Sequence, residues 1–288
     1  MGRTAILVLI AGLAAGCLPK PRIVVGSKNF TEQVLLGEII AGQIERRLGF
    51  VVERKLDLGG TLLAHEALKS GSIDLYPEYT GTALTAILKR APVREAKEAL
   101  DAVREGYRPW RLEWLPPLGF DNTFAMVVRA SSAREQGLRT LSDAARRPHP
   151  WRLGAGYEFT ARPDGLKGLV RTYGLRLGEE PVAMDLGLLY PALQKKTIEM
   201  AAANRTDGML ARPEFTALED DRHYFPPYQC AIVVRRDALD RFPGLRAALA
   251  ELSNRIPDSA MRRMNELVDV EHRPAAEVAR EFLSNGGE

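Results

Sequence analysis

The chain has 288 residues, of which 45% are hydrophobic and 27% are charged, and its formal net charge is +3. This length allows two lobes around substantial cores. Basic and acidic residues are interspersed without a long basic run, so the sequence has no pattern typical of nucleic-acid binding.

The first sixteen residues resemble a secretory signal. Arg3 precedes an apolar run over residues 5–15, which is shorter than the roughly 20 residues that span a bilayer. The run ends in LAAGC, which resembles a bacterial lipobox and predicts lipidation of Cys17. The alternative is an ordinary signal peptide cut near Gly16. No second apolar stretch in the sequence is long enough to span a membrane. The lipid would therefore tether the chain in the periplasm or on the outer face of the cell membrane.

The sequence contains two cysteines, Cys17 and Cys230. If Cys17 carries a lipid, Cys230 has no partner for a disulfide. The exported protein must then be held together by its hydrophobic core alone.

Strands and helices are predicted to alternate from Ile23 onward. A strand at 23–25 is followed by Asn29 and, three residues later, Glu32, a spacing typical of a capping box at a helix start. Apolar residues recur every four positions from Leu36 to Leu48 and predict a helix that ends at Gly49. Further strands are expected near 50–52 and 73–76, with a helix from 61 to 71 between them.

The second half of the chain continues the alternation. We predict a charged helix at 93–105, strands at 124–128, 152–155, 200–203 and 231–234, helices that start at 141 and 166, and amphipathic helices between 243 and 283. This order indicates an α/β fold with mainly parallel sheets. The simplest arrangement is a second α/β unit inserted in the first, with two crossings between them. Residues 22–125 and 226–288 would form the first lobe and residues 126–225 the second.

Patterns typical of catalysis are missing from the sequence. It contains no GxxxxGK[ST] phosphate loop and no GxSxG motif, and its histidines are not at metal-ligand spacing. Cys230 lies in an apolar strand, where a thiol is inert. We therefore expect no enzyme activity, no metal and no cofactor.

Polar and aromatic residues lie instead where predicted strands end and helices begin. Lys28 lies in the first such loop, Thr61 in the second, and Tyr79 and Thr82 flank the third. We expect these three loops to open on the same edge of one sheet, where small ligands bind. Helix N-termini favour a carboxylate. The ring of Tyr79 can attract a quaternary ammonium by about 0.5–2 kcal/mol, although the spacing alone equally allows Tyr79 to be a packing residue.

Longer segments combine into a family-specific set: GSKNFTEQ, LGGTLLAHEALKSGSIDLYPEYTGT, WLPPLGFDNTFAM, GYEFTARPDGL, RTDG and FPPYQCAIVVR. Together they resemble the glycine betaine/carnitine/choline-binding proteins of osmoprotectant ABC transporters over almost the whole mature chain. The resemblance implies a type II periplasmic-binding-protein fold, in which two α/β lobes close on a ligand cleft by a hinge motion. It also implies a small zwitterionic or cationic solute as ligand, and an ABC permease with its ATPase as partners.

The resemblance assigns site residues as well. Tyr79 and Tyr228 would belong to an aromatic cage, and Lys28 and Thr82 would contact the carboxylate of the ligand. Arg162 would reach the same carboxylate from the second lobe, where a guanidinium can bind bidentately. Without the family motif, Arg162 would be interpreted as a surface arginine beside a turn.

The chain departs from the family pattern at two positions. Phe124 stands where relatives often have tyrosine, and Asn204 lies near a position where they often have an aromatic residue. A cage with fewer rings leaves the solute open, so another zwitterion such as ergothioneine or an amino acid is an alternative. A sensory binding protein, or an enzyme on the same scaffold, is the remaining alternative, although the sequence offers the enzyme no nucleophile or metal cluster.

Overall fold

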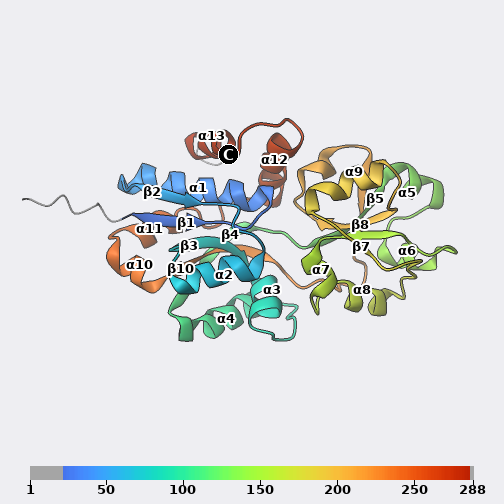
Figure 1. Cartoon of the computed structure of the whole chain (residues 1–288), viewed down its shortest axis with the longest axis horizontal. Helices are drawn as coiled ribbons and strands as arrows, with labels where there is room; N and C mark the ends of the chain where they lie inside the picture. The colour runs from blue at the N-terminus through green and yellow to red at the C-terminus, as the bar shows by residue number, and fades with distance from the viewer. Residues whose placement is uncertain (1–21, 286–288) are drawn as a thin grey trace, which may run out of the picture.

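The computed structural model describes residues 22–285, so the predicted signal segment and Cys17 lie outside the described residues. The described chain forms two α/β lobes that lie side by side along the long axis of the molecule (Figure 1). Each lobe is built on one five-stranded sheet. Within the described chain, every helix is too short or too polar for a transmembrane span.

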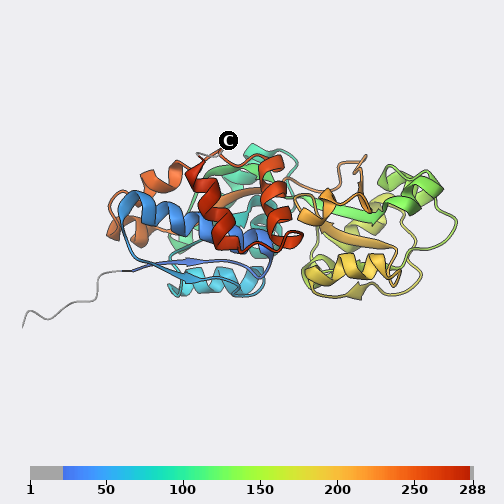
Figure 2. The ribbon, with the colours of Figure 1, turned by 90° about the horizontal axis from the view of Figure 1, so that it is seen from above.

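The sheet of the first lobe has the order β2-β1-β3-β10-β4. Its strands are β1 (Ile23–Gly26), β2 (Val52–Lys55), β3 (Leu75–Tyr79), β4 (Leu112–Asp121) and β10 (Gln229–Arg235). Helices cover both faces of this sheet, and α12 and α13 pack against α1 (Figure 2). The helical elements are α1 (Thr31–Leu48), α2 (Thr61–Ser70), α3 (Thr80–Thr82), η1 (Ala83–Ile87), α4 (Ala96–Tyr107), η2 (Arg108–Trp110), α10 (Arg236–Arg241), α11 (Leu245–Ala250), α12 (Asp258–Asp269) and α13 (Ala275–Ser284).

The sheet of the second lobe has the order β7-β6-β8-β5-β9. Its strands are β5 (Phe124–Arg129), β6 (Leu153–Ala155), β7 (Val182–Ala183), β8 (Met200–Asn204) and β9 (Phe215–Leu218). The helical elements are α5 (Ala130–Gln136), α6 (Leu141–Arg146), α7 (Tyr157–Ala161), α8 (Leu166–Tyr173), η3 (Leu186–Leu188), α9 (Leu189–Gln194) and η4 (Gly208–Ala211).

Four of the five strands in each sheet run in one direction, which confirms the prediction of mainly parallel sheets, and one strand runs against them. β1 is parallel to β2 and β3, but β10 is antiparallel to β3 and β4. In the second lobe β6 is parallel to β7 and β8, whereas β5 is antiparallel to β8 and β9. β5 and β10 each follow a segment that crosses from the other lobe. This segment reaches the sheet at the edge where the other strands end, so β5 and β10 run in the opposite direction.

Two crossing segments connect the lobes and lie against each other. The first runs from β4 to β5 and the second from β9 to β10, and the N–H of Asn122 donates to the C=O of Tyr228 at 3.2 Å. The lobe boundaries proposed near residues 125 and 226 fall at the start of β5 and just before β10. The hydrogen bond holds the two crossing segments in register at the centre of the molecule.

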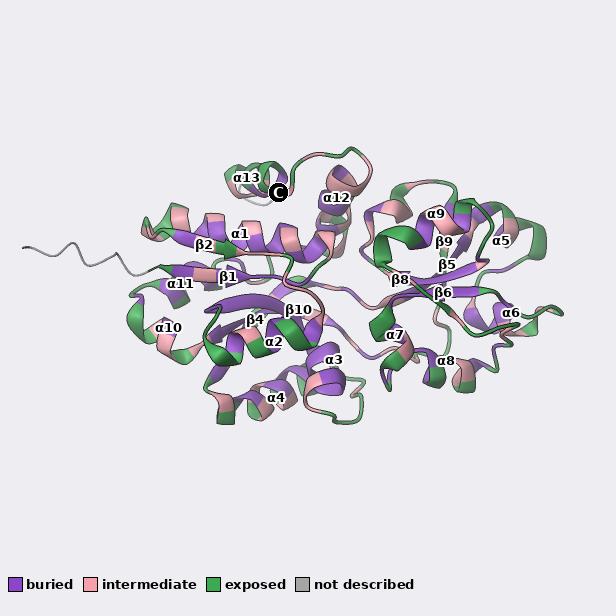
Figure 3. Ribbon diagram, in the orientation of Figure 1, coloured by how far each residue is buried: buried purple, intermediate pink, exposed green. Residues whose placement is uncertain are grey.

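Apolar side chains pack on both faces of each sheet, and the buried residues follow the strands through both lobes (Figure 3). On α1 the side chains of Leu36, Ile40 and Ile44 are fully buried, as their spacing of four predicts. Burial of such side chains stabilises the fold by about 1.5–3 kcal/mol each. The helix ends at Gly49 in the left-handed conformation, which confirms that prediction.

The start of α1 differs from the prediction. The N-cap residue is Phe30, and no side chain caps the helix. The prediction of a capping box formed by Asn29 and Glu32 is therefore wrong. Glu32 lies four residues before Leu36 on the same face of the helix and is buried with it. The carboxylate of Glu32 therefore points into the molecule and bonds with side chains there.

Candidate functional site

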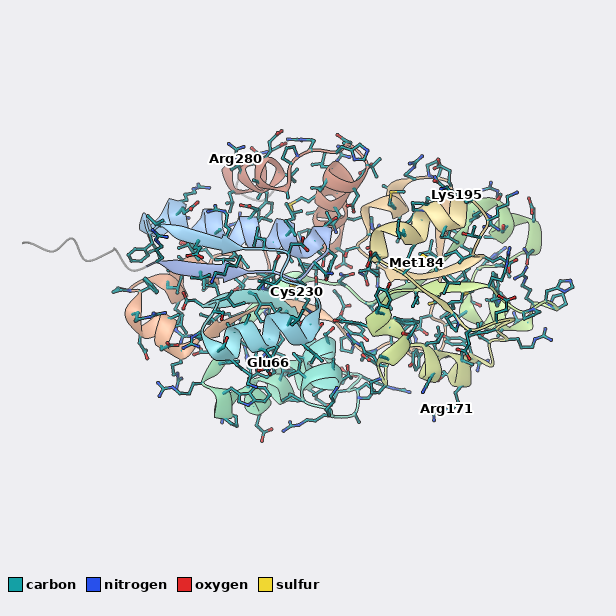
Figure 4. All side chains as sticks on the ribbon, in the orientation of Figure 1. Glu66, Arg171, Met184, Lys195, Cys230 and Arg280 are labelled. Atoms are coloured by element: carbon teal, nitrogen blue, oxygen red, sulfur yellow. The ribbon has the colours of Figure 1, made fainter. Side chains whose placement is uncertain are left out.

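The predicted site residues meet where the first lobe faces the second. β1, β2 and β3 are parallel, so the loops that follow them open at one edge of the sheet, as predicted. Side chains from both lobes reach into the space between the ribbons, with Cys230 marking β10 (Figure 4). We call this region the interlobe junction; it contains Lys28, Glu32, Thr61, Glu78, Tyr79, Thr82, Thr85, Phe124, Glu158, Arg162, Asp164, Thr206 and Tyr228.

Arg162 joins the lobes at the centre of the junction. Its guanidinium donates to Asp164 of its own lobe at 2.9 and 2.5 Å, and to the hydroxyls of Thr82 at 3.0 Å and Thr85 at 3.2 Å in the first lobe. The side chain of Arg162 is 7% exposed. Burial opposes ionisation of Asp164, but the hydrogen bonds and charge of Arg162 lower the pKa of that carboxyl below its ordinary value. The pair is therefore ionised at neutral pH.

The same guanidinium lies beside two aromatic rings. The Cζ atom of Arg162 is 5.3 Å from the ring centre of Phe124 and 5.5 Å from that of Tyr228. These two rings are in edge-to-face contact at 5.4 Å. The hydroxyl of Tyr228 donates to Asp164 at 2.5 Å. The ring faces predicted for a ligand cation thus already contact a cation of the protein.

Lys28 lies in a separate group around Glu78. Its Nζ atom is 2.5 Å from Oε1 of Glu78 and 5.0 Å from the ring centre of Tyr79. Glu78 is fully buried and also accepts hydrogen bonds from the hydroxyl of Tyr76 at 2.9 Å and the N–H of Tyr79 at 2.7 Å. The positive charge of Lys28 is thereby neutralised inside the first lobe.

Thr61 begins helix α2 and binds a carboxylate from the second lobe. Its N–H donates to Glu158 at 2.6 Å and its hydroxyl donates to the same carboxylate at 2.9 Å. Partial burial opposes ionisation of Glu158, but the charge of Lys28 and the two bonds from Thr61 lower the pKa of its carboxyl below the ordinary value. A carboxylate does bind at this helix N-terminus, and it belongs to the protein.

Glu32 is a second bridge between the lobes. Its carboxylate accepts hydrogen bonds from Tyr79 at 2.6 Å, from Asn122 at 2.8 Å, from Asn265 at 3.0 Å and from the hydroxyl of Thr206 in the second lobe. Burial raises the pKa of Glu32 above its ordinary value, although these four bonds oppose the rise. The carboxylate ties α1, α12 and both lobes together.

The structure does not bring all predicted cage residues into one group. Tyr228 and Phe124 contact each other, whereas Tyr79 stacks on Phe30 with ring centres 6.4 Å apart. Asn204 pairs with Phe124 across β5 and β8, so it lies beside the aromatic group. The N–H of Asn204 is bonded to Asp207 at 3.1 Å.

Sequence reasoning missed the carboxylates of the junction. Glu32, Glu78, Glu158 and Asp164 all lie in motifs that we singled out, yet none was predicted to belong to the site. For Glu32 a signal existed, because it precedes Leu36, Ile40 and Ile44 at the same spacing of four residues and therefore lies on the buried face of the helix. Glu78 lies in a strand in which every residue is buried. An acidic residue at such a position needs a partner.

The chain has two α/β lobes that are joined by paired crossing segments and meet at a polar and aromatic junction. This architecture is that of a solute-binding protein. The chain belongs to the family described as the substrate-binding domain of ABC-type glycine betaine transport systems, whose model matches residues 21–285. It is therefore a non-catalytic substrate-binding protein of an ABC transporter, and the two-lobed α/β fold is confirmed.

Individual relatives are similar over most of the chain. A glycine-betaine-binding protein of Pseudomonas aeruginosa is 34% identical over 284 residues, which are 95% of this chain and 91% of that protein. The ergothioneine transport permease/ergothioneine binding protein EgtU of Helicobacter pylori is 32% identical over 92% of this chain, which spans only 48% of that longer protein. The solved structure of a glycine betaine/carnitine/choline ABC transporter protein has a TM-score of 0.78 at 29% identity, covering 92% of this chain and 100% of that one.

Proposed function

We propose that the protein captures a quaternary-ammonium solute of the glycine betaine, choline or carnitine type in the interlobe junction and delivers it to an ABC permease and its ATPase. The similarity to the glycine-betaine-binding protein of Pseudomonas aeruginosa supports this class of solute. We also propose that a lipid on Cys17 holds the protein in the periplasm or on the outer face of the cell membrane.

The contact of Arg162 with the rings of Phe124 and Tyr228 carries the proposal. A guanidinium at 5.3 and 5.5 Å from two ring centres is attracted by the negative face of each ring. A trimethylammonium group is attracted by the same faces, and it has no hydrogen atoms that require acceptors. Phe124 has no hydroxyl, but its ring supplies the same attraction.

The proposed donors for a ligand carboxylate are already paired with carboxylates of the protein. Lys28 pairs with Glu78, Thr61 with Glu158, and Arg162 with Asp164. The carboxylate of glycine betaine must therefore share or displace one of these groups. Choline has no carboxylate, so its ammonium group competes only with the guanidinium of Arg162 at the rings. We expect choline to bind at least as tightly as glycine betaine.

A second candidate ligand is ergothioneine, a zwitterion that also carries a trimethylammonium group. The 32% identity to the ergothioneine binding protein of Helicobacter pylori favours it. The position of Asn204 beside Phe124 adds a side-chain amide next to the aromatic group. An amide can hydrogen-bond to a larger polar ligand but offers no ring to an ammonium group.

Isothermal titration calorimetry of the purified chain with glycine betaine, choline, carnitine, proline betaine and ergothioneine tests the proposal. Absence of heat with all five compounds would contradict it. Tyr228→Leu removes the ring, whereas Tyr228→Phe keeps it and removes only the hydroxyl. If the ring binds the cation, the leucine variant should bind about tenfold more weakly than the phenylalanine variant. Equal affinities of the two variants would exclude Tyr228 from the cation site.

A further inference from the structure

A pocket of about 850 Å³ lies at the opposite end of the first lobe from the interlobe junction. β4 begins at this pocket and ends at the junction. Its two ends pair with Arg235 and Gln229 of β10, which are six residues apart, so about 20 Å separate the two ends. Five arginines and one glutamate line it, which gives its charged side chains a formal charge of +4. These residues are Arg104, Arg108, Arg111, Glu113, Arg236 and Arg246.

The acidic residue of the pocket is already engaged. Glu113 accepts two hydrogen bonds from Arg246 and lies 3.9 Å from Arg236. Among residues 22–285, Arg108 and Arg111 have no carboxylate within ion-pair distance. Both residues line the pocket and are exposed, so a ligand can reach their guanidinium groups. No carboxylate of the described chain pairs with these two positive charges.

The backbone fixes the spacing of three of these arginines. Arg111 has φ of +56°, in the left-handed region that a residue with a side chain rarely adopts. Its N–H donates to the C=O of Arg108 at 2.9 Å, and its C=O accepts from the N–H of Arg236 at 2.9 Å. Trp114 also lines the pocket, and its buried indole N–H has no hydrogen-bond partner in the described part of the chain. The backbone positions of Arg108, Arg111 and Arg236 are thus fixed relative to one another.

The pocket lies at the end of the sheet where the described chain begins. One row of paired residues crosses the sheet from Val25 through Leu75 and Val234 to Glu113. Three strand spacings of about 4.8 Å place Glu113 about 14 Å from Val25. Ile23 lies at the same edge, and the six residues from Cys17 to Ile23 can reach at most about 20 Å. A lipid on Cys17 would keep this edge near the membrane surface.

We propose that the arginine pocket binds the phosphate of an anionic lipid head group at the membrane to which the protein is tethered. A guanidinium binds two oxygens of a phosphate at once, and several arginines around one pocket can contact the same phosphate. The membrane assignment depends on the proposed lipid anchor, but the affinity of the pocket for phosphate does not.

Vesicle flotation and calorimetry separate the possible sources of phosphate. The mature chain from residue 17 onward carries Cys17→Ser in every sample, so that neither the predicted signal segment nor an attached lipid contributes to binding. It is mixed with vesicles of phosphatidylcholine alone or of phosphatidylcholine with phosphatidylglycerol, and it is separately titrated with inorganic pyrophosphate. The pocket variant is Arg108→Gln with Arg236→Gln. The control is Arg134→Gln with Arg171→Gln, which removes the same charge from exposed positions on the second lobe.

The chain should float with the anionic vesicles and not with phosphatidylcholine alone. The pocket variant should bind about tenfold more weakly, and the control should bind within about twofold of the parent. Equal weakening in both variants would show attraction by net charge only and would overturn the proposal, as would absence of binding. Binding of pyrophosphate without binding of vesicles would overturn the lipid assignment, because the pocket would then take a free phosphate compound.

Discussion

The hydroxyl of Tyr228 provides a direct test of whether the lobes touch in the unliganded protein. Tyr228 precedes β10 of the first lobe, and its hydroxyl donates to Asp164 of the second lobe at 2.5 Å. Tyr228→Phe removes this bond and keeps the ring, which is 2% exposed. The change leaves Asp164 with its bonds from Arg162 and Thr85.

The magnitude follows from the kind of bond. A buried hydrogen bond to a charged group contributes about 1.5–3 kcal/mol, and Asp164 is 2% exposed, so water does not replace the lost donor. We expect Tyr228→Phe to lower the free energy of unfolding by about 2 kcal/mol. Asp164→Asn also breaks the ion pair with Arg162 and should cost more.

Urea unfolding of the parent, both single variants and the double variant forms a double-mutant cycle. If the lobes touch as described, the coupling energy between Tyr228→Phe and Asp164→Asn should be about 1–2 kcal/mol. The control cycle combines Asp164→Asn with Tyr190→Phe, whose hydroxyl is bonded to Asp207 and not to Asp164. That pair should be additive within about 0.5 kcal/mol. Additivity in both cycles would refute the reasoning, because it would mean that the lobes stand apart without ligand.

Three further results are expected. Tyr79→Ala should weaken binding of a cationic solute by more than about tenfold in calorimetry, and unchanged affinity would remove Tyr79 from the proposed cage. Burial raises the pKa of Asp207 from 3.8 to about 7, so the folded state binds this proton more tightly than the unfolded state. Stability should therefore fall by up to about 4 kcal/mol as pH rises from 4 to 7, and Asp207→Asn should flatten this slope in thermal melts. Gly208→Ala would place a Cβ atom 2.4 Å from the backbone nitrogen of Glu266, so we expect a loss of about 1–3 kcal/mol, and an unchanged melting temperature would contradict the close packing of η4 on α12.

The local pattern of the sequence predicts most elements of the first lobe. The spacing of Leu36, Ile40 and Ile44 predicts the buried face of α1, and Gly49 and Gly71 end their helices in the left-handed conformation. These features depend on residues a few positions apart, which is why periodicity and capping chemistry reveal them. Strand boundaries were less accurate: β3 begins at Leu75, two residues later than predicted, because the carboxylate of Asp74 accepts the N–H of Val24.

The sequence also placed Lys28, Thr61 and Thr82 in loops at one edge of a sheet. It did not reveal what they bind there. The partner of Thr61 is Glu158, 97 residues away, and that of Thr82 is Arg162, 80 residues away. Such pairs depend on how the second lobe is positioned over the first, which no local propensity encodes.

By itself, then, the sequence determined the alternation of strands and helices, the loops at which polar residues collect and the family to which they point. Only the tertiary structure decided the directions of β5 and β10 and the pairing of each cation in the interlobe junction with a carboxylate of the protein. The physical reason is the distance along the chain. Glu32 and Asn265, for instance, are bonded across 233 residues. Such a contact within the first lobe forms only after the chain has passed through the second lobe and returned, because the entropy of closing so long a loop must be offset by the packing of the whole fold.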